Sequence, residues 1–194
     1  MKSDFSPILF PEAEAPPEAI NCQKCELHKQ RARVIWGEGN LHAPIIVLLD
    51  NPGAREDKEG DPFVCGSRQT LQLAAFEAGL KMEDLYITYI LKCRPVRRYD
   101  KETARSTCMV HLIQQIQLQK PNFALCMGNI AVQWFFGNMD AEVKNLRGIW
   151  HNVREIPTTV SYHPLAVRRR PNLLAQFMQD WKTLAQRYYS ERQG

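Results

Sequence analysis

Short runs of strand-forming residues alternate along the chain with longer segments of helical periodicity. The short runs predict strands at 45–49, 86–91, 123–127 and 157–162. The longer segments predict helices at 68–79, 103–120, 129–136 and 173–189. Strands that alternate with helices are typical of a parallel sheet covered on both faces. We therefore predict an α/β fold with three layers, α/β/α, around a central four-stranded parallel sheet.

The first 20 residues follow neither pattern. They contain four prolines and four acidic residues, which predicts a poorly ordered N-terminal arm over residues 1–20. The remaining residues, 21–194, have a length that suits one compact domain. The hydrophobic content of 44% is sufficient for its core.

Membrane and secretory functions do not fit the sequence. No apolar run approaches the roughly 20 residues needed to cross a bilayer. Residues 1–8 lack the apolar core and the small-residue cleavage site of a secretory signal. We expect a monomeric, cytoplasmic protein with no membrane partner.

The net charge of +4 is mild and excludes little. The distribution of basic residues is more informative, because they cluster in two segments, 92–101 and 168–170. Such a cluster is most often a solvated surface. Both segments, however, follow predicted strands at points where chemistry is expected, and this favours contacts with phosphate groups.

Three of the predicted strands are followed by polar and turn-forming residues. These are Asp50–Gly53, Lys92–Pro95 and Tyr162–Pro164. The carboxyl ends of parallel strands lie at one edge of a sheet, where binding sites gather. We therefore expect the three segments to contribute to one functional site.

The six cysteines indicate a metal site rather than disulfides, because a chain without an export signal meets a reducing compartment. Cys22 and Cys25 form a C-x-x-C pair, whose spacing can place two thiolates on one metal. The pair is a weak signal until two further cysteines complete the coordination sphere. Cys126, in the middle of an apolar strand, is expected to be a buried thiol.

A series of short motifs runs in a fixed order from about residue 21 to residue 181. They are Cys22-Gln23-Lys24-Cys25-Glu26-Leu27, Gly37-Glu38-Gly39, Leu49-Asp50-Asn51-Pro52-Gly53-Ala54-Arg55-Glu56-Asp57, Gly60-Asp61-Pro62-Phe63-Val64, Tyr86-Ile87-Thr88-Tyr89-Ile90-Leu91-Lys92-Cys93-Arg94-Pro95, Leu146-Arg147-Gly148 and Tyr162-His163-Pro164. In this order, the motifs resemble those of the family 4 uracil-DNA glycosylases, which carry a [4Fe–4S] cluster. The resemblance implies a uracil-DNA glycosylase fold and DNA as the partner. It also implies a DNA-repair enzyme that hydrolyses the N-glycosidic bond of uracil, or of another deaminated base, flipped out of DNA.

The resemblance further implies the ligands of the metal site. It matches two later cysteines to the remaining ligands of the family, so that a [4Fe–4S] cluster of structural role would be held by Cys22, Cys25, Cys93 and Cys108. Four thiolates also suit zinc, which stays an alternative cofactor.

For the base pocket, the resemblance implies that Phe63 stacks on the flipped base and that His163 donates a hydrogen bond to the charge developing on it. Without the resemblance, Phe63 would fit the core equally well. Pro52 and Gly53 would line the pocket, and Cys65 either lines it or has a core or neutral role.

The segment 164–170 resembles the loop that enters the minor groove and fills the gap left by the flipped nucleotide. Leu165 or Val167 would be the wedge. Phosphate groups would be held by the basic residues Arg94, Arg97, Arg168, Arg169 and Arg170.

Two positions depart from the family pattern. Asp50 and Asn51 stand where the family has Glu-Ala, and an Asn before Pro is similar to the mismatch-specific and single-strand-selective relatives, in which the carboxamide positions the attacking water. We therefore expect Asn51 to orient the water, with Asp50 as a second catalytic candidate. Tyr89 replaces the Asn that reads the uracil edge, so one hydroxyl stands in place of a paired donor and acceptor. The preferred base is therefore open.

Three functions follow from these features. The first is a glycosylase acting on uracil or another deaminated base. The second is a damaged-DNA or single-strand binding protein of the same fold, with lost or altered catalysis, in which Tyr89 serves as a stacking surface. The third is a nucleotide-handling protein stabilised by zinc or a cluster, with unrelated substrates.

Overall fold

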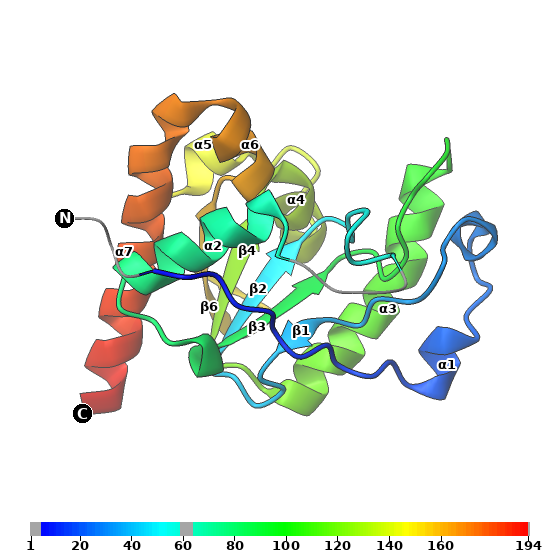
Figure 1. Ribbon diagram of the computed structural model, residues 1–194, viewed down its shortest axis with the longest axis horizontal. Coiled ribbons are helices and arrows are strands. Elements are labelled where there is room, and N and C mark those ends of the chain that lie inside the picture. Colours follow the sequence, from blue (N-terminus) through cyan, green and yellow to red (C-terminus); the bar gives the residue numbers. More distant parts are fainter. Residues whose placement is uncertain (1–4, 59–63, 194) are drawn as a thin grey trace.

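The structure, a computed structural model, describes residues 5–58 and 64–193. Its centre is a six-stranded sheet with the strand order β1-β3-β2-β4-β6-β5 (Figure 1). The strands are β1 (Glu38–Gly39), β2 (Ile45–Leu49), β3 (Leu85–Tyr89), β4 (Phe123–Met127), β5 (His151–Val153) and β6 (Ile156–Ser161). The α-helices are α1 (Pro17–Ile20), α2 (Gly66–Glu77), α3 (Lys101–Gln119), α4 (Asn129–Phe136), α5 (Val143–Leu146), α6 (Pro164–Arg169) and α7 (Leu174–Gln193), and short 3-10 turns are η1 (Glu26–Lys29), η2 (Met82–Asp84) and η3 (Pro171–Leu173).

The four predicted strands form the parallel centre of the sheet, in which β2 pairs with β3 and β4, and β4 pairs with β6. The predicted number of strands is wrong, because the sheet has six. β1 pairs antiparallel with β3 and β5 pairs antiparallel with β6, so a short antiparallel strand closes each edge. With 2 and 3 residues, these strands are too short to produce a periodic pattern in the sequence.

Helices pack on both faces of the sheet, which confirms the predicted three layers. On one face, apolar residues of α2 and α7 join alternate strand residues in a core that includes Leu71, Phe177 and Trp181. On the other face, α3 and α4 supply Leu112 and Val132 among others. Burial on both faces explains why the parallel strands consist largely of uninterrupted apolar residues.

The N-terminal segment differs from the predicted poorly ordered arm from residue 5 onward. Phe10 is buried in the core. The Gln72 side chain on α2 bonds both backbone groups of Ile8, at 2.9 Å to its N–H and 2.8 Å to its carbonyl oxygen. Farther along, the Ala13 N–H donates to the Gly37 carbonyl oxygen at 2.9 Å. An apolar anchor and paired backbone groups therefore attach this segment to the domain.

Helix α3 has well-defined ends, and these fix which of its residues face the interior. The Asp100 side chain accepts hydrogen bonds from the N–H groups of Glu102 and Thr103, each at 3.1 Å, and so caps the first turn. Arg105 and Cys108, one turn apart on the same face, are both buried.

In the described part of the chain, none of the helices has the length and apolar character required to span a bilayer.

Candidate active site

A pocket of about 290 Å³ lies at the carboxyl ends of β2, β3 and β6. Its walls come from the turn after β2, the start of α2, the end of β3 and the start of α6 (Figure 1). The lining residues are Leu49, Asp50, Asn51, Gly53, Glu56, Cys65, Ser67, Arg68, Tyr89, His163, Pro164 and Leu165. Segments that are far apart in the sequence meet here because parallel strands end at the same edge of the sheet.

The turn after β2 is held by an ion pair to α3. Arg105 donates to Asp50 through Nε at 3.1 Å and through Nη2 at 3.0 Å, a two-point contact that fixes the carboxylate. Asn51 donates from Nδ2 to the Pro52 carbonyl oxygen at 2.8 Å, which leaves its Oδ1 as the acceptor of the side chain. Asp50 therefore presents a fixed negative charge, and Asn51 a fixed acceptor.

His163 is the N-cap of α6, and its capping bond defines its tautomer. The Leu165 N–H donates to His163 Nδ1 at 3.1 Å, so the ring proton of the neutral imidazole lies on Nε2. Burial, together with the positive charge of Arg68, lowers the pKa of His163 to about 4, although Asp50 opposes the shift. His163 is thus a neutral hydrogen-bond donor at physiological pH.

Gly128 makes room for this histidine. Its φ is +92°, and a Cβ at this position would lie 3.0 Å from the Cβ of His163. A side chain here would be strained in its backbone and would press on the imidazole.

A buried network of four charged residues stands behind Tyr89. Arg68 donates to the Tyr89 hydroxyl and, through Nε, to Glu38. Arg55 donates to Glu38 at 2.8 Å and to Glu56 at 3.1 Å, and Glu56 also accepts the Gly53 N–H at 2.9 Å. The positive charges of two guanidinium groups and the negative charges of two carboxylates thereby compensate one another in the buried interior.

Burial and the nearby carboxylates raise the pKa of Tyr89 well above its usual range, with Arg68 acting in the opposite direction, so the phenol keeps its proton. Arg68, Glu38 and Glu56 are not among the site residues predicted from the sequence. Glu38 and Glu56 belong to motifs that the sequence shows, so these motifs could have indicated a role for them. Arg68 lies outside every motif and reaches the site only because α2 packs on the sheet.

The structure brings together most of the predicted site residues but buries Val167, one of the two candidates for the wedge. Asp50, Asn51, Gly53, Tyr89, His163 and Leu165 line the pocket, while Pro52 is buried beside them. Val167 is 3% exposed and packs in the core, so it is wrong as a candidate wedge. The reason is that 164–170 is largely helical rather than a loop, and α6 turns Val167 inward and Leu165, 40% exposed, outward. Phe63 lies outside the described residues.

Most of the predicted phosphate-binding residues are exposed. Arg168, Arg169 and Arg170 are exposed, and Arg168 donates to the carbonyl oxygen of Gly66, the first residue of α2, at 3.3 Å. In the other segment, Arg97 is exposed and Arg94 lies 3.8 Å from Asp57. A polyanion can therefore contact these side chains without a rearrangement of the protein.

The cysteines of the predicted metal site gather at one corner of the domain. Cys93 and Cys108 are buried, and Cys25 packs against them in a small apolar cluster. Arg31 links the fourth cysteine, Cys22, to this group, since its Nη1 donates to the Cys22 carbonyl oxygen at 3.0 Å and to Cys93 Sγ at 3.3 Å. The backbone N–H of Lys92 donates to Cys108 Sγ at 3.2 Å.

This corner has the character of a thiolate site. N–H groups pointing at sulfur stabilise negative charge on it, and burial raises the pKa of the Cys108 thiol to about 12, so a cation is needed to make it a thiolate. Within residues 5–58 and 64–193, however, no three His, Cys, Asp or Glu side chains are grouped closely enough to hold a single metal ion. Cys126 is fully buried in an apolar core, as predicted, and Cys65 lines the pocket.

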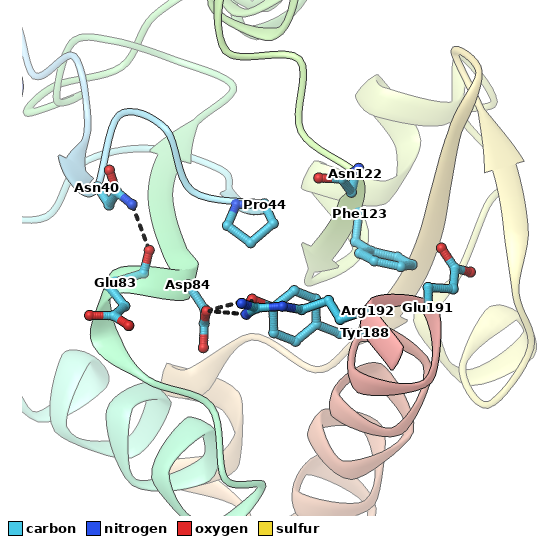
Figure 2. Close-up of a pocket in the computed structure, with 9 residues that line it drawn as sticks. All are labelled: Asn40, Pro44, Glu83, Asp84, Asn122, Phe123, Tyr188, Glu191 and Arg192. Atoms are coloured by element: carbon cyan, nitrogen blue, oxygen red, sulfur yellow. Dashed lines mark hydrogen bonds and ion pairs between the residues drawn. The ribbon is translucent and has the colours of Figure 1, made fainter. Parts of the chain in front are cut away.

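A larger hollow, of about 590 Å³, lies at the opposite end of the sheet (Figure 2). Figure 2 shows Arg192 directed at Asp84 and Asn40 directed at Glu83. Tyr188 donates to Asp84 at 2.6 Å, Arg192 lies 3.7 Å from the same carboxylate, and Asn40 donates to the Glu83 carbonyl oxygen at 2.7 Å. Because these groups satisfy one another, we assign the chemistry to the smaller pocket.

Comparison with known proteins identifies the family of the chain. Residues 36–185 match the model of the uracil DNA glycosylase superfamily. The chain is 33% identical over 177 residues to a type-4 uracil-DNA glycosylase of Archaeoglobus fulgidus, which covers 87% of this chain and 89% of the relative. It is 33% identical to the protein of the same name from Pyrobaculum aerophilum, with coverage of 82% and 86%, and 32% identical to that from Thermotoga maritima, with coverage of 81% and 83%. The chain therefore belongs to the uracil DNA glycosylase superfamily.

Proposed function

We propose that the protein is a DNA-repair glycosylase that hydrolyses the N-glycosidic bond of uracil, or of another deaminated base, flipped out of DNA. The names of its relatives support this activity. The observation that carries the proposal is the neutral His163, whose Nε2–H has no hydrogen-bond partner among residues 5–58 and 64–193, beside the fixed turn of Asp50 and Asn51.

Each of these groups suits one part of the reaction. As the bond between C1′ and the base nitrogen breaks, its electron pair leaves with the base, and the His163 Nε2–H stabilises the negative charge. Positive charge develops on the sugar at the same time, and the Asp50 carboxylate stabilises it electrostatically. The water that forms the new bond to C1′ is oriented by Asn51 Oδ1, and its proton finally replaces the sugar on the base.

The four cysteines would hold a [4Fe–4S] cluster, which would fasten the segment 21–31 to the sheet and order the basic segment 94–101. A cluster takes one thiolate per iron and so spreads its sulfurs more widely than a single zinc ion does. The resemblance to enzymes that carry such a cluster favours it over zinc. A brown protein that absorbs near ~400 nm would support the cluster, and stoichiometric zinc in a colourless protein would contradict it.

DNA would lie across the mouth of the pocket, with Leu165 filling the gap left by the flipped nucleotide. The exposed arginines of α6 and of the 94–101 segment would neutralise phosphates on either side. Stacking of Phe63 on the base stays a prediction. Binding should weaken steeply as salt rises, and a salt-independent interaction would refute this part of the proposal.

The activity can be tested with duplex and single-stranded oligonucleotides that carry one uracil, hypoxanthine or xanthine, followed by alkaline cleavage of abasic sites. We expect strand scission, and a loss of roughly a hundredfold in rate for His163→Asn, whose side-chain oxygen can replace Nδ1 as the N-cap acceptor but whose amide cannot reach as far into the pocket. His42→Gln, at an exposed position, is the control and should keep full activity.

A second function is favoured by one observation: the position that reads the base in the family holds Tyr89, already bonded to Arg68. A protein with this pocket could bind damaged DNA without cleaving it. Retained binding with no scission on any of the three substrates would support this function and refute the glycosylase.

A further inference from the structure

The wall of the pocket formed by Tyr89 and Arg68 has an unusual hydrogen-bonding character. Both residues line the pocket. Arg68 can only donate hydrogen bonds, and one of its N–H groups is directed at the oxygen of Tyr89. Because that oxygen already accepts from Arg68, the phenol offers its own hydrogen to a ligand. This wall therefore presents donors.

The neighbouring carboxylates do not offset this character. Glu38 accepts from Arg68 with Oε1 and from Arg55 with Oε2. Glu56 accepts from Arg55 with Oε1 and from the Gly53 N–H with Oε2. Every carboxylate oxygen of these two residues thus already accepts a hydrogen bond within the protein, and both negative charges are paired with guanidinium groups.

An edge made of donors does not match uracil. The uracil edge offers a donor, N3–H, beside the acceptor O4, and a carboxamide would complement both. Against Tyr89 and Arg68, the N3–H would meet another donor and stay unpaired, which costs binding.

The edge of a deaminated purine does match. Hypoxanthine and xanthine carry O6 next to N7, the pair of adjacent acceptors that guanidinium groups recognise on guanine. Adenine has an amino group in place of O6 and would present a donor to the same wall. A pocket of this kind would therefore separate hypoxanthine from adenine, its parent base, whereas xanthine and guanine present the same O6 and N7 to this wall. The same donors would also stabilise the negative charge that departs with the purine.

We propose that Tyr89 and Arg68 are the specificity-determining residues of this pocket and select deaminated purines, hypoxanthine and xanthine, over uracil. This inference rests on the proposed glycosylase activity.

The test compares single-turnover excision rates on oligonucleotides that differ only in the damaged base. We expect the wild-type protein to excise hypoxanthine at least tenfold faster than uracil. Tyr89→Phe removes the donor and keeps the ring, so hypoxanthine excision should fall roughly tenfold or more, with no gain on uracil. Tyr89→Asn should reverse the preference.

The matched control is Tyr86→Phe, which removes a buried hydroxyl from the same strand on the opposite face of the sheet. It should leave the ratio of the two rates unchanged, and thermal unfolding should show that all variants are folded. Faster excision of uracil than of hypoxanthine by the wild type, or an unchanged rate in Tyr89→Phe, would overturn the specificity proposal while the glycosylase stands. Absence of excision on every base would instead refute the proposed function itself.

Discussion

His163 should remain uncharged far below the pH at which an ordinary histidine titrates. The relevant perturbation is acidification from about pH 8 to pH 5. With a pKa of about 4, roughly 1% of His163 side chains would be protonated at pH 6, compared with about three quarters for a free histidine of pKa about 6.5. The two cases are therefore easily separated.

The same pKa sets the contribution of His163 to stability. Because the folded protein binds this proton less tightly than the unfolded chain, the contribution is complete above about pH 6.5 and is lost as the pH falls towards 4. A decrease from about 6.5 to about 4 corresponds to roughly 3 kcal/mol, of which about 2 kcal/mol would be lost by pH 5.

The direct assay is an NMR titration of protein with ¹³C at histidine Cε1, which gives five resonances for the five histidines. His163→Asn identifies the resonance by its disappearance. The His163 resonance should show no inflection between pH 8 and about pH 5, and excision should keep its rate across the same range if this group limits it. An inflection near pH 6.5 would refute the assignment of a neutral donor held by burial and by the Leu165 N–H.

Three further predictions concern the turn after β2, the proposed metal site and the proposed phosphate contacts. Arg105→Gln should lower the free energy of unfolding by about 2–3 kcal/mol, since it leaves Asp50 without its buried partner; a loss below ~0.5 kcal/mol in urea denaturation would contradict this role. Cys108→Ser should abolish the absorbance near ~400 nm, whereas Cys126→Ala should keep it, and equal spectra for the two variants would remove Cys108 from the metal site. Arg169→Gln should reduce the slope of log affinity against log salt by up to about 1, and an unchanged slope would mean that this residue contacts no phosphate.

The parallel centre of the fold could be predicted from the sequence because its strands are buried on both faces. Ile45–Leu49 and Phe123–Met127 are uninterrupted apolar runs, and the structure has strands at these same residues. The edge strands could not be predicted, since Glu38–Gly39 pairs through its backbone and needs no apolar side chains. The same applies to α6, where Pro164 begins a helix too short to show a period.

The candidate site was predictable to the extent that it lies at strand ends. Asn51, Tyr89 and His163 follow or end strands, and the parallel sheet brings them together. Arg68 was not predictable, because its ion pair with Glu38 joins residues 30 positions apart that approach only after α2 has packed on the sheet. Charge networks of this kind depend on tertiary geometry and leave no spacing in the sequence.

Arg105 and Cys108 occupy successive turns of α3, Arg105 bonded to Asp50 in the turn after β2 and Cys108 at the cysteine-rich corner. Because a short stretch of rigid helical backbone joins these two residues, a shift of the helix at one of them also shifts the other. If the cysteines hold the proposed cluster, a preparation in which only some molecules carry it would be a mixture of active-site geometries. Turnover numbers should therefore be normalised to metal content, and batches that differ in colour should differ in rate by more than protein concentration explains.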